Sequence, residues 1–110
     1  EVNITADGYC LSDTGRLCGS TMPVLKGIQN LVENVGIAMK YATRMASRNP
    51  AIVYGYPNKG VLEVGKDADL IVIDDQYRCL FTFVEGRCVY DRQREGDVFN
   101  QEFLLTHRIV

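Results

Sequence analysis

The chain carries a single histidine, His107, which limits the hydrolytic chemistry that its side chains can perform. Metal-dependent hydrolysis needs several His, Asp, Glu or Cys ligands around one ion, with an open position for water. Cys10 and Cys18 lie close together in the sequence, but two thiols without further ligands do not make a zinc site. A cysteine nucleophile would also need a positioned base, and His107, in the terminal tail, is the only imidazole. We therefore expect neither a catalytic residue nor a metal site in this chain.

Four carboxylates, Asp67, Asp69, Asp74 and Asp75, could be taken for an acidic cluster. Asp67 lies in a predicted turn, where its side chain can bond to nearby backbone. Asp69 and Asp74 bracket a predicted strand, where carboxylates usually end the strand or face solvent. We expect these residues to have structural roles.

A glycine-rich loop, residues 15–20, comes before a predicted helix. The backbone N–H groups of Gly15, Gly19 and Ser20 could hold an oxyanion or a sugar hydroxyl. Glycine-rich entries to helices are also common without any ligand, so both interpretations remain open on these residues alone.

Apolar residues recur with two different periods before residue 56, first that of a strand and then that of a helix. Residues 2–11 alternate apolar groups around Asp7-Gly8, a pair favoured in two-residue hairpins, and residues 12–15 suit a turn. The apolar positions from Val24 to Val35 then fall on one helical stripe, with Pro23 at its first turn and Gly36 at its end. The sequence thus predicts a hairpin and then a helix.

Two further helices are expected before Gly55. One covers about residues 39–48 and turns four side chains inward: Met39, Ala42, Met45 and Ala46. The other is short, capped by Asn49, opening at Pro50 and closing at Gly55.

The pattern changes to strands after Gly55. Residues 61–64 form a predicted short strand, and the continuous apolar run 70–73 predicts a strand covered on both faces. Residues 79–84 and 87–90 flank Glu85-Gly86, which predicts a tight hairpin. The fold class is therefore α+β, with helices before strands.

Composition limits which binding partners and which cellular compartment we expect for the protein. The formal net charge of −2 favours neither nucleic acid nor an anionic membrane, and no apolar run reaches the ~20 residues that span a bilayer. The first residues lack a signal peptide's basic region and apolar core, and the absence of an initiator Met fits a segment of something longer. The four cysteines could form two disulfides in a secreted protein, but no pair has CxxC spacing and nothing else suggests secretion. We therefore expect reduced thiols in a cytoplasmic protein.

Several motifs together resemble the amidohydrolase superfamily and, within it, the N-acetylglucosamine-6-phosphate deacetylases. The superfamily pattern is Asn49-Pro50-Ala51, Gly60 and residues 65–70, and the narrower match rests on residues 15–20, 30–33 and 45–47. The resemblance covers about residues 1–92. It implies that residues 1–56 are the last helices of a (β/α)8 barrel with a hairpin insertion and that 57–92 are strands of a small β-sandwich. Residues 93–110 are a tail that it leaves unassigned.

The resemblance also implies a function. In that family a divalent metal, zinc or iron, activates the water that removes acetate from N-acetylglucosamine 6-phosphate, and an upstream Asp acts as base and then acid. The metal ligands, that Asp and the phosphate-binding residues would precede residue 1, so the segment alone is expected to be inactive and metal-free. What carries over is the loop that lines the sugar site, namely Leu17, Cys18, Gly19 and Ser20. Cys18 stands where Ala or Ser is more usual.

The same resemblance leads to expectations about binding partners, and two alternative functions remain. We expect an amino-sugar phosphate as substrate of the whole enzyme, and a homo-oligomer, because two copies could cover apolar surfaces that a barrel would otherwise cover. Another amidohydrolase is one alternative. A stand-alone binding or assembly module is the other.

Overall fold

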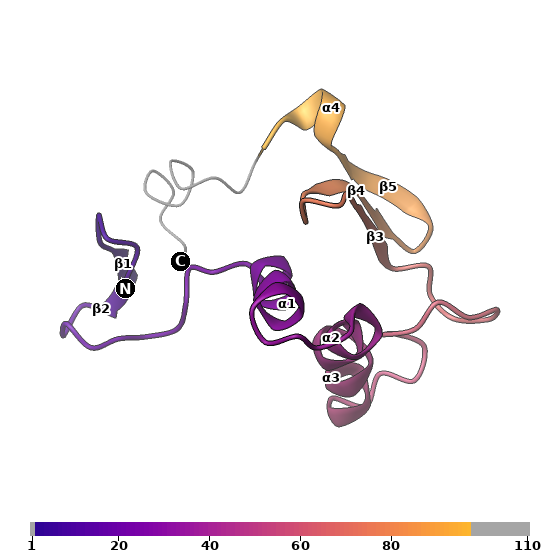
Figure 1. Ribbon diagram of the computed structural model, residues 1–110, viewed down its shortest axis with the longest axis horizontal. Helices are drawn as coiled ribbons and strands as arrows, with labels where there is room; N and C mark the ends of the chain where they lie inside the picture. Colours follow the sequence, from indigo (N-terminus) through magenta and orange to yellow (C-terminus); the bar gives the residue numbers. More distant parts are fainter. Residues whose placement is uncertain (1, 98–110) are drawn as a thin grey trace. The chain divides into compact units, whose positions relative to one another are not determined.

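A computed structural model describes residues 2–97 of the chain (Figure 1). The chain divides into two compact units, of which the first contains the residues before Val24 and the second is Val24–Gly96. The predictions for the tail beyond residue 97, including His107, lie outside the described residues. In the described residues no helix is long and apolar enough to cross a membrane.

A small antiparallel hairpin forms the first unit, as the sequence predicts. Strands β1 (Val2–Ile4) and β2 (Cys10–Ser12) pair with Ile4 opposite Cys10. The connection is longer than the two-residue turn expected from Asp7-Gly8. Thr5 extends it, because its hydroxyl accepts a hydrogen bond from Tyr9 N at 3.0 Å and its carbonyl accepts one from Gly8 N at 2.9 Å.

Helix α1 (Val24–Glu33) opens the second unit and confirms the predicted apolar stripe. Ile28 is buried on that stripe, whereas Val24 and Val35 at its two ends are exposed. The chain leaves the helix through Gly36, which has a positive φ of 81°, and Ile37 N donates to the Leu31 carbonyl at 2.9 Å. A left-handed residue of this kind is the usual way for a helix to end, and glycine adopts it without a Cβ clash.

The next two helices, α2 (Met39–Ala46) and α3 (Arg48–Val53), meet at a sharp break. Ser47 lies there with φ −127° and ψ −71°, so α3 starts before Asn49 and the predicted Asn49 cap is wrong. Pro50 is tolerated in the first turn, where a missing N–H costs no hydrogen bond. The predicted end at Gly55 is confirmed: Tyr56 N donates to the Ala51 carbonyl at 2.8 Å across Gly55, whose φ is 72°.

Apart from Ile28, the side chains buried in these helices are alanines. α1 packs on α2 and α2 on α3, and Ala42 is completely buried. The predicted inward positions Met39 and Met45 are instead exposed, and Ala46 is half-buried. Three short helices provide too few neighbours to cover a long side chain as well as an alanine.

The predicted strand at residues 61–64 is wrong. Leu62 and Val64 are exposed, and the segment between α3 and β3 is a series of turns in which Lys66 N donates to the Glu63 carbonyl at 3.1 Å. β-Branched residues favour a strand only when a neighbouring strand supplies ladder bonds and packing, and in the described residues this segment pairs with none.

A three-stranded antiparallel sheet completes the second unit (Figure 1). Its strands are β3 (Leu70–Ile73), β4 (Cys79–Val84) and β5 (Arg87–Asp91), in the order β3-β4-β5. Glu85 and Gly86 both have positive φ, 49° and 77°, which confirms the tight hairpin. The expectation that β3 is covered on both faces is wrong, because Ile71 is half exposed.

A short helix, α4 (Arg92–Glu95), follows the sheet and extends into the tail 93–110, for which the sequence predicts no element. The Asp91 carboxylate accepts from Gln93 N at 3.0 Å and caps it.

The hydrophobic core is very small. In the described residues only Ile28, Ala42 and Ala51 are buried hydrophobics, while Val53, Leu62 and Val64 are at least three-quarters exposed. Isolated apolar residues on a surface are ordinary, but an apolar surface this extensive usually marks an interface.

Candidate functional site

The glycine-rich loop predicted to line a sugar site is held against β2 in the first unit. Leu17 bridges to Leu11 in antiparallel fashion. Ser12 N donates to the Arg16 carbonyl at 2.8 Å, and Cys18 N donates to the Cys10 carbonyl at 2.8 Å. The loop therefore leaves its turn alongside β2, joined to it by this isolated bridge and the two backbone bonds.

The turn at residues 12–15, which precedes this loop, was predicted from the sequence and is confirmed. Gly15 N donates to the Ser12 carbonyl at 2.9 Å, and Gly15 has a φ of 76°. The Ser12 hydroxyl contacts that of Thr14 at 2.9 Å and accepts from Arg16 N at 3.2 Å. Side chain and backbone together fix the direction in which the loop continues.

The other end of the loop is anchored by two hydroxyls. Ser20 Oγ accepts from Met22 N at 3.0 Å, and Thr21 Oγ1 donates to the Gly8 carbonyl at 2.8 Å. Gly19, immediately before these contacts, has a φ of 84°, and a Cβ added there would meet nothing within 4 Å. Glycine is thus used at this position for its backbone conformation.

This arrangement separates the four predicted substrate-binding residues into two kinds. The N–H of Cys18 is already used by the Cys10 carbonyl. The N–H groups of Leu17, Gly19 and Ser20 donate to no described residue. Unpaired N–H groups in a loop of mixed handedness can bind an oxygen of a ligand, and the exposed Leu17 side chain lies beside them.

All four cysteines are free thiols in this structure, with Cys88 exposed and Cys10, Cys18 and Cys79 half-buried. Burial raises the pKa of the Cys10 thiol, and the neighbouring Cys18 raises it further. In the described residues no group of three or more His, Cys, Asp or Glu side chains could hold a metal ion.

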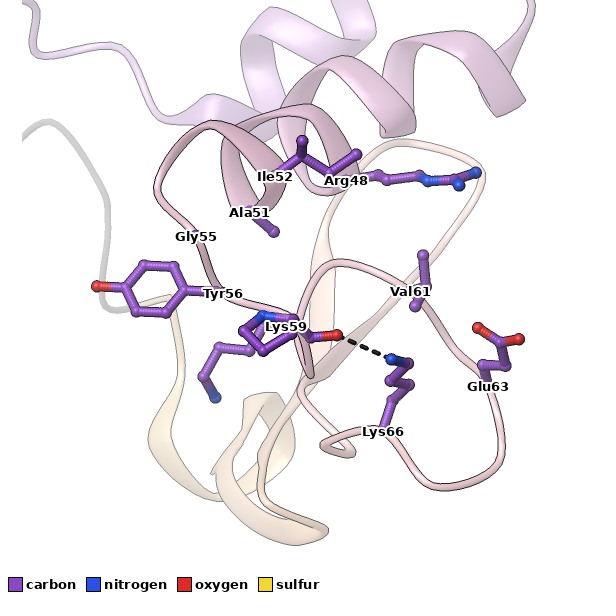
Figure 2. A pocket seen from close by; sticks show the side chains of 10 residues that line it. Arg48, Ala51, Ile52, Gly55, Tyr56, Lys59, Val61, Glu63 and Lys66 are labelled. Atoms are coloured by element: carbon purple, nitrogen blue, oxygen red, sulfur yellow. Dashed lines mark hydrogen bonds between the residues drawn. The ribbon is translucent and has the colours of Figure 1, made fainter.

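A groove lies in the second unit, and the sequence did not indicate it. It is an open groove of about 610 Å³ between α3 and the loop that follows (Figure 2). Arg48 and Ile52 line the helix side, and Glu63 and Lys66 line the loop side. The Lys66 ammonium donates to the Pro57 carbonyl at 2.8 Å, so it holds the loop together.

Gly60 sets how closely that loop approaches the helices. A Cβ on Gly60 would lie 2.8 Å from the Ser47 carbonyl oxygen, 2.9 Å from Ala51 Cβ and 3.0 Å from Arg48 Cα. The φ of Gly60 is 85°. The residue that the family resemblance singled out is therefore a packing requirement at the junction of α2 and α3.

Three of the four aspartates that resemble an acidic cluster, Asp67, Asp69 and Asp74, have structural roles, as predicted. Lys59 Nζ contacts Asp67 Oδ2 at 3.1 Å and Asp69 Oδ2 at 2.5 Å, while Asp69 Oδ1 accepts from Glu85 N at 2.8 Å. The Lys59 contacts tie together the loop before β3, and the Asp69–Glu85 bond joins that loop to the β4–β5 hairpin. Asp74 likewise orders the β3–β4 turn, accepting from Arg78 N at 2.8 Å and Arg78 Nε at 2.6 Å.

The Asp69 contacts predict a pH dependence. The hydrogen bond to Lys59, followed by the one from Glu85 N, holds the pKa of Asp69 below its ordinary value of 3.8. A lowered folded-state pKa adds stability that is fully present above the unfolded pKa and lost as pH falls through the folded one. Asp69→Asn should therefore weaken the second unit slightly at pH 7, and wild type should approach the variant as the pH falls below 3.8.

Urea unfolding at pH 7 and pH 3 checks this expectation. Asp69→Ala serves as the matched comparison, because it also removes the acceptor for Glu85 N and should cost more than Asp69→Asn at both pH values. An effect of Asp69→Asn that stays equal at both pH values would contradict the ion-pair role.

Comparison with known proteins identifies the family to which the chain belongs. The pattern that defines the Amidohydrolase family matches residues 4–98, and the chain belongs to this family.

The most similar relatives narrow the resemblance. The N-acetylglucosamine-6-phosphate deacetylase of Vibrio furnissii is 34% identical over 76% of this chain and 21% of its own length, and that of Homo sapiens is 31% identical over 82% and 22%. The crystal structure of the Pasteurella multocida deacetylase superposes with a TM-score of 0.69 and 32% identity, covering 79% of this chain and 23% of that one. The predicted resemblance is confirmed, and the chain spans about a fifth to a quarter of the length of these relatives.

Proposed function

We propose that this chain supplies part of the sugar-binding site of an N-acetylglucosamine-6-phosphate deacetylase, an enzyme that releases acetate to give glucosamine 6-phosphate. The observation that carries the proposal is the loop 17–20, which is held at both ends and whose N–H groups at Leu17, Gly19 and Ser20 donate to nothing within residues 2–97. Its support is the similarity to deacetylases over most of the chain.

The work of this segment is binding rather than bond cleavage. The free N–H groups would donate to hydroxyl or carbonyl oxygens of the amino sugar, and the exposed Leu17 side chain would pack on the sugar's apolar surface. A binding loop of this kind orients the acetamide for attack, which is a large part of catalysis. Backbone donors also tolerate Cys18, since side-chain identity matters little to them.

The metal that the family uses does not fit the described residues. A zinc or iron ion would supply an activated water when bound, but a hydrolytic site needs at least three protein ligands, and no such group exists among residues 2–97. We propose that the metal ligands and the catalytic Asp belong to other parts of the enzyme, so that this segment alone is inactive.

The exposed apolar surface supports the same proposal. Val24, Ile52 and Val53 are each about two-thirds exposed or more, and fully burying one such side chain is worth about 1.5–3 kcal/mol. We propose that residues 1–56 end a (β/α)8 barrel and that 57–92 join a β-sandwich, which would cover this surface. A cytoplasmic homo-oligomer remains our expectation for the whole enzyme.

A segment exchange tests the function. Residues 4–98 of this chain replace the matching segment of the Vibrio furnissii deacetylase, and acetate release from N-acetylglucosamine 6-phosphate is measured. We expect the exchanged enzyme to be active and this chain alone to be inactive. The metal content and melting temperature of the exchanged enzyme establish that it has folded.

A further inference from the structure

Two of the four cysteines face each other across the edge of the first hairpin. The antiparallel bridge between Leu11 and Leu17 places Cys10 directly opposite Cys18. The Cys18 N–H donates to the Cys10 carbonyl at 2.8 Å, as expected for such a pair. Directly opposed residues project to the same face of a sheet, so both thiols lie on one side.

The spacing of this pair suits a covalent link. Cα atoms of a hydrogen-bonded antiparallel pair lie about 5.5 Å apart, close to the most common Cα separation in disulfides. The thiols are near enough to interact, because Cys18 contributes to raising the pKa of Cys10 after the larger effect of burial. Both are free and half-buried, which leaves them accessible to a small reagent.

The other two cysteines lack this relationship. Cys79 lies opposite Ile73, and Cys88 lies opposite Phe83. Their thiols donate to backbone carbonyls of their own strands, Cys79 to Phe81 at 3.4 Å and Cys88 to Tyr90 at 3.3 Å. They provide an internal control in the same chain.

We propose that Cys10 and Cys18 form a reversible cross-strand disulfide when the chain meets a low-molecular-weight disulfide as oxidant. One thiolate attacks a sulfur of the oxidant, forming a mixed disulfide and releasing the first small thiol. The second thiolate then attacks the protein sulfur of that mixed disulfide and releases the second small thiol. The cysteine pair is oxidised, the small disulfide is reduced, and the two protons pass to the released thiolates.

The disulfide would close residues 10–18 into a ring and fix Leu17 at the start of the candidate sugar-binding loop. This consequence for binding rests on the proposed function, whereas formation of the disulfide does not. The thiol chemistry can therefore be tested without any activity measurement. Because thiolate is the reacting form, the raised pKa of Cys10 implies a reaction that speeds up as pH rises.

The test uses the whole chain and oxidised glutathione. After incubation and acid quenching, the denatured protein should retain two of its four thiols, and peptide mapping should find Cys10 linked to Cys18. Dithiothreitol should restore all four. Retention of all four thiols would overturn the proposal, as would separate glutathione adducts on Cys10 and Cys18, or a link involving Cys79 or Cys88 instead.

Two variants sharpen the result. Cys88→Ser should form the same link and keep one free thiol, from Cys79. Cys18→Ser should form no internal link, with Cys10 either free or carrying glutathione. An internal disulfide in the Cys18→Ser protein would show that the cysteines exchange partners freely and would refute a specific pair.

Discussion

Gly60→Ala should destabilise the second unit by about 2–5 kcal/mol. Forcing a non-glycine residue into a left-handed conformation costs roughly 1–2 kcal/mol, and overpacking a fitted site costs a further 1–3 kcal/mol or so. The new Cβ would lie 2.8 Å from the Ser47 carbonyl oxygen, which is backbone and cannot rotate away. Urea unfolding followed by circular dichroism measures the loss.

Gly65→Ala is the matched control for this substitution. Gly65 has nearly the same φ, 86° against 85°, but a Cβ there meets nothing within 4 Å. It should therefore show only the conformational cost of about 1–2 kcal/mol. Equal losses in the two variants would mean that the loop does not pack on the α2–α3 junction as described.

Gly19→Val in the exchanged enzyme should lower kcat/KM for N-acetylglucosamine 6-phosphate by about tenfold or more. A β-branched residue at a φ of 84° is strongly disfavoured, so the backbone must turn and carry the N–H groups of Gly19 and Ser20 away from the sugar. Loss of one hydrogen bond worth about 1.4 kcal/mol corresponds to tenfold. The change should appear mainly in KM, which steady-state kinetics resolves.

Gly15→Val separates binding from folding. Gly15 also has a positive φ, 76°, with open space around its Cα, but it lies in the turn before the binding loop. Its substitution should lower the melting temperature by as much as Gly19→Val while leaving KM nearly unchanged. Equal increases in KM would argue against a binding role for the loop.

Sequence reasoning succeeded where a local rule decides the structure. The Glu85-Gly86 hairpin and the helix end at Gly55 each depend on a glycine at positive φ, Gly86 in the hairpin and Gly55 after the helix. The stripe containing Ile28 follows from helical periodicity alone. The backbone pairing that places Leu17 and Cys18 against β2 was not predicted, because it depends on pairing Cys18 with Cys10 across a turn.

Three of the failures share one physical cause. The strand at residues 61–64, the burial of Met39 and Met45, and the two-sided cover of β3 all require neighbours that the described residues do not supply. Apolar patterning specifies which surface is to be buried but not what covers it. The groove beside α3 was not predicted for a related reason. It depends on the close approach of Gly60 to the junction of α2 and α3.

The rate of acetate release by the exchanged enzyme tests the central proposal most directly. If residues 4–98 supply the sugar-binding loop of an N-acetylglucosamine-6-phosphate deacetylase, kcat/KM should stay within about tenfold of the unmodified Vibrio furnissii enzyme, a margin of 1.4 kcal/mol. A folded, metal-loaded exchanged enzyme that releases no acetate above background would contradict the proposal.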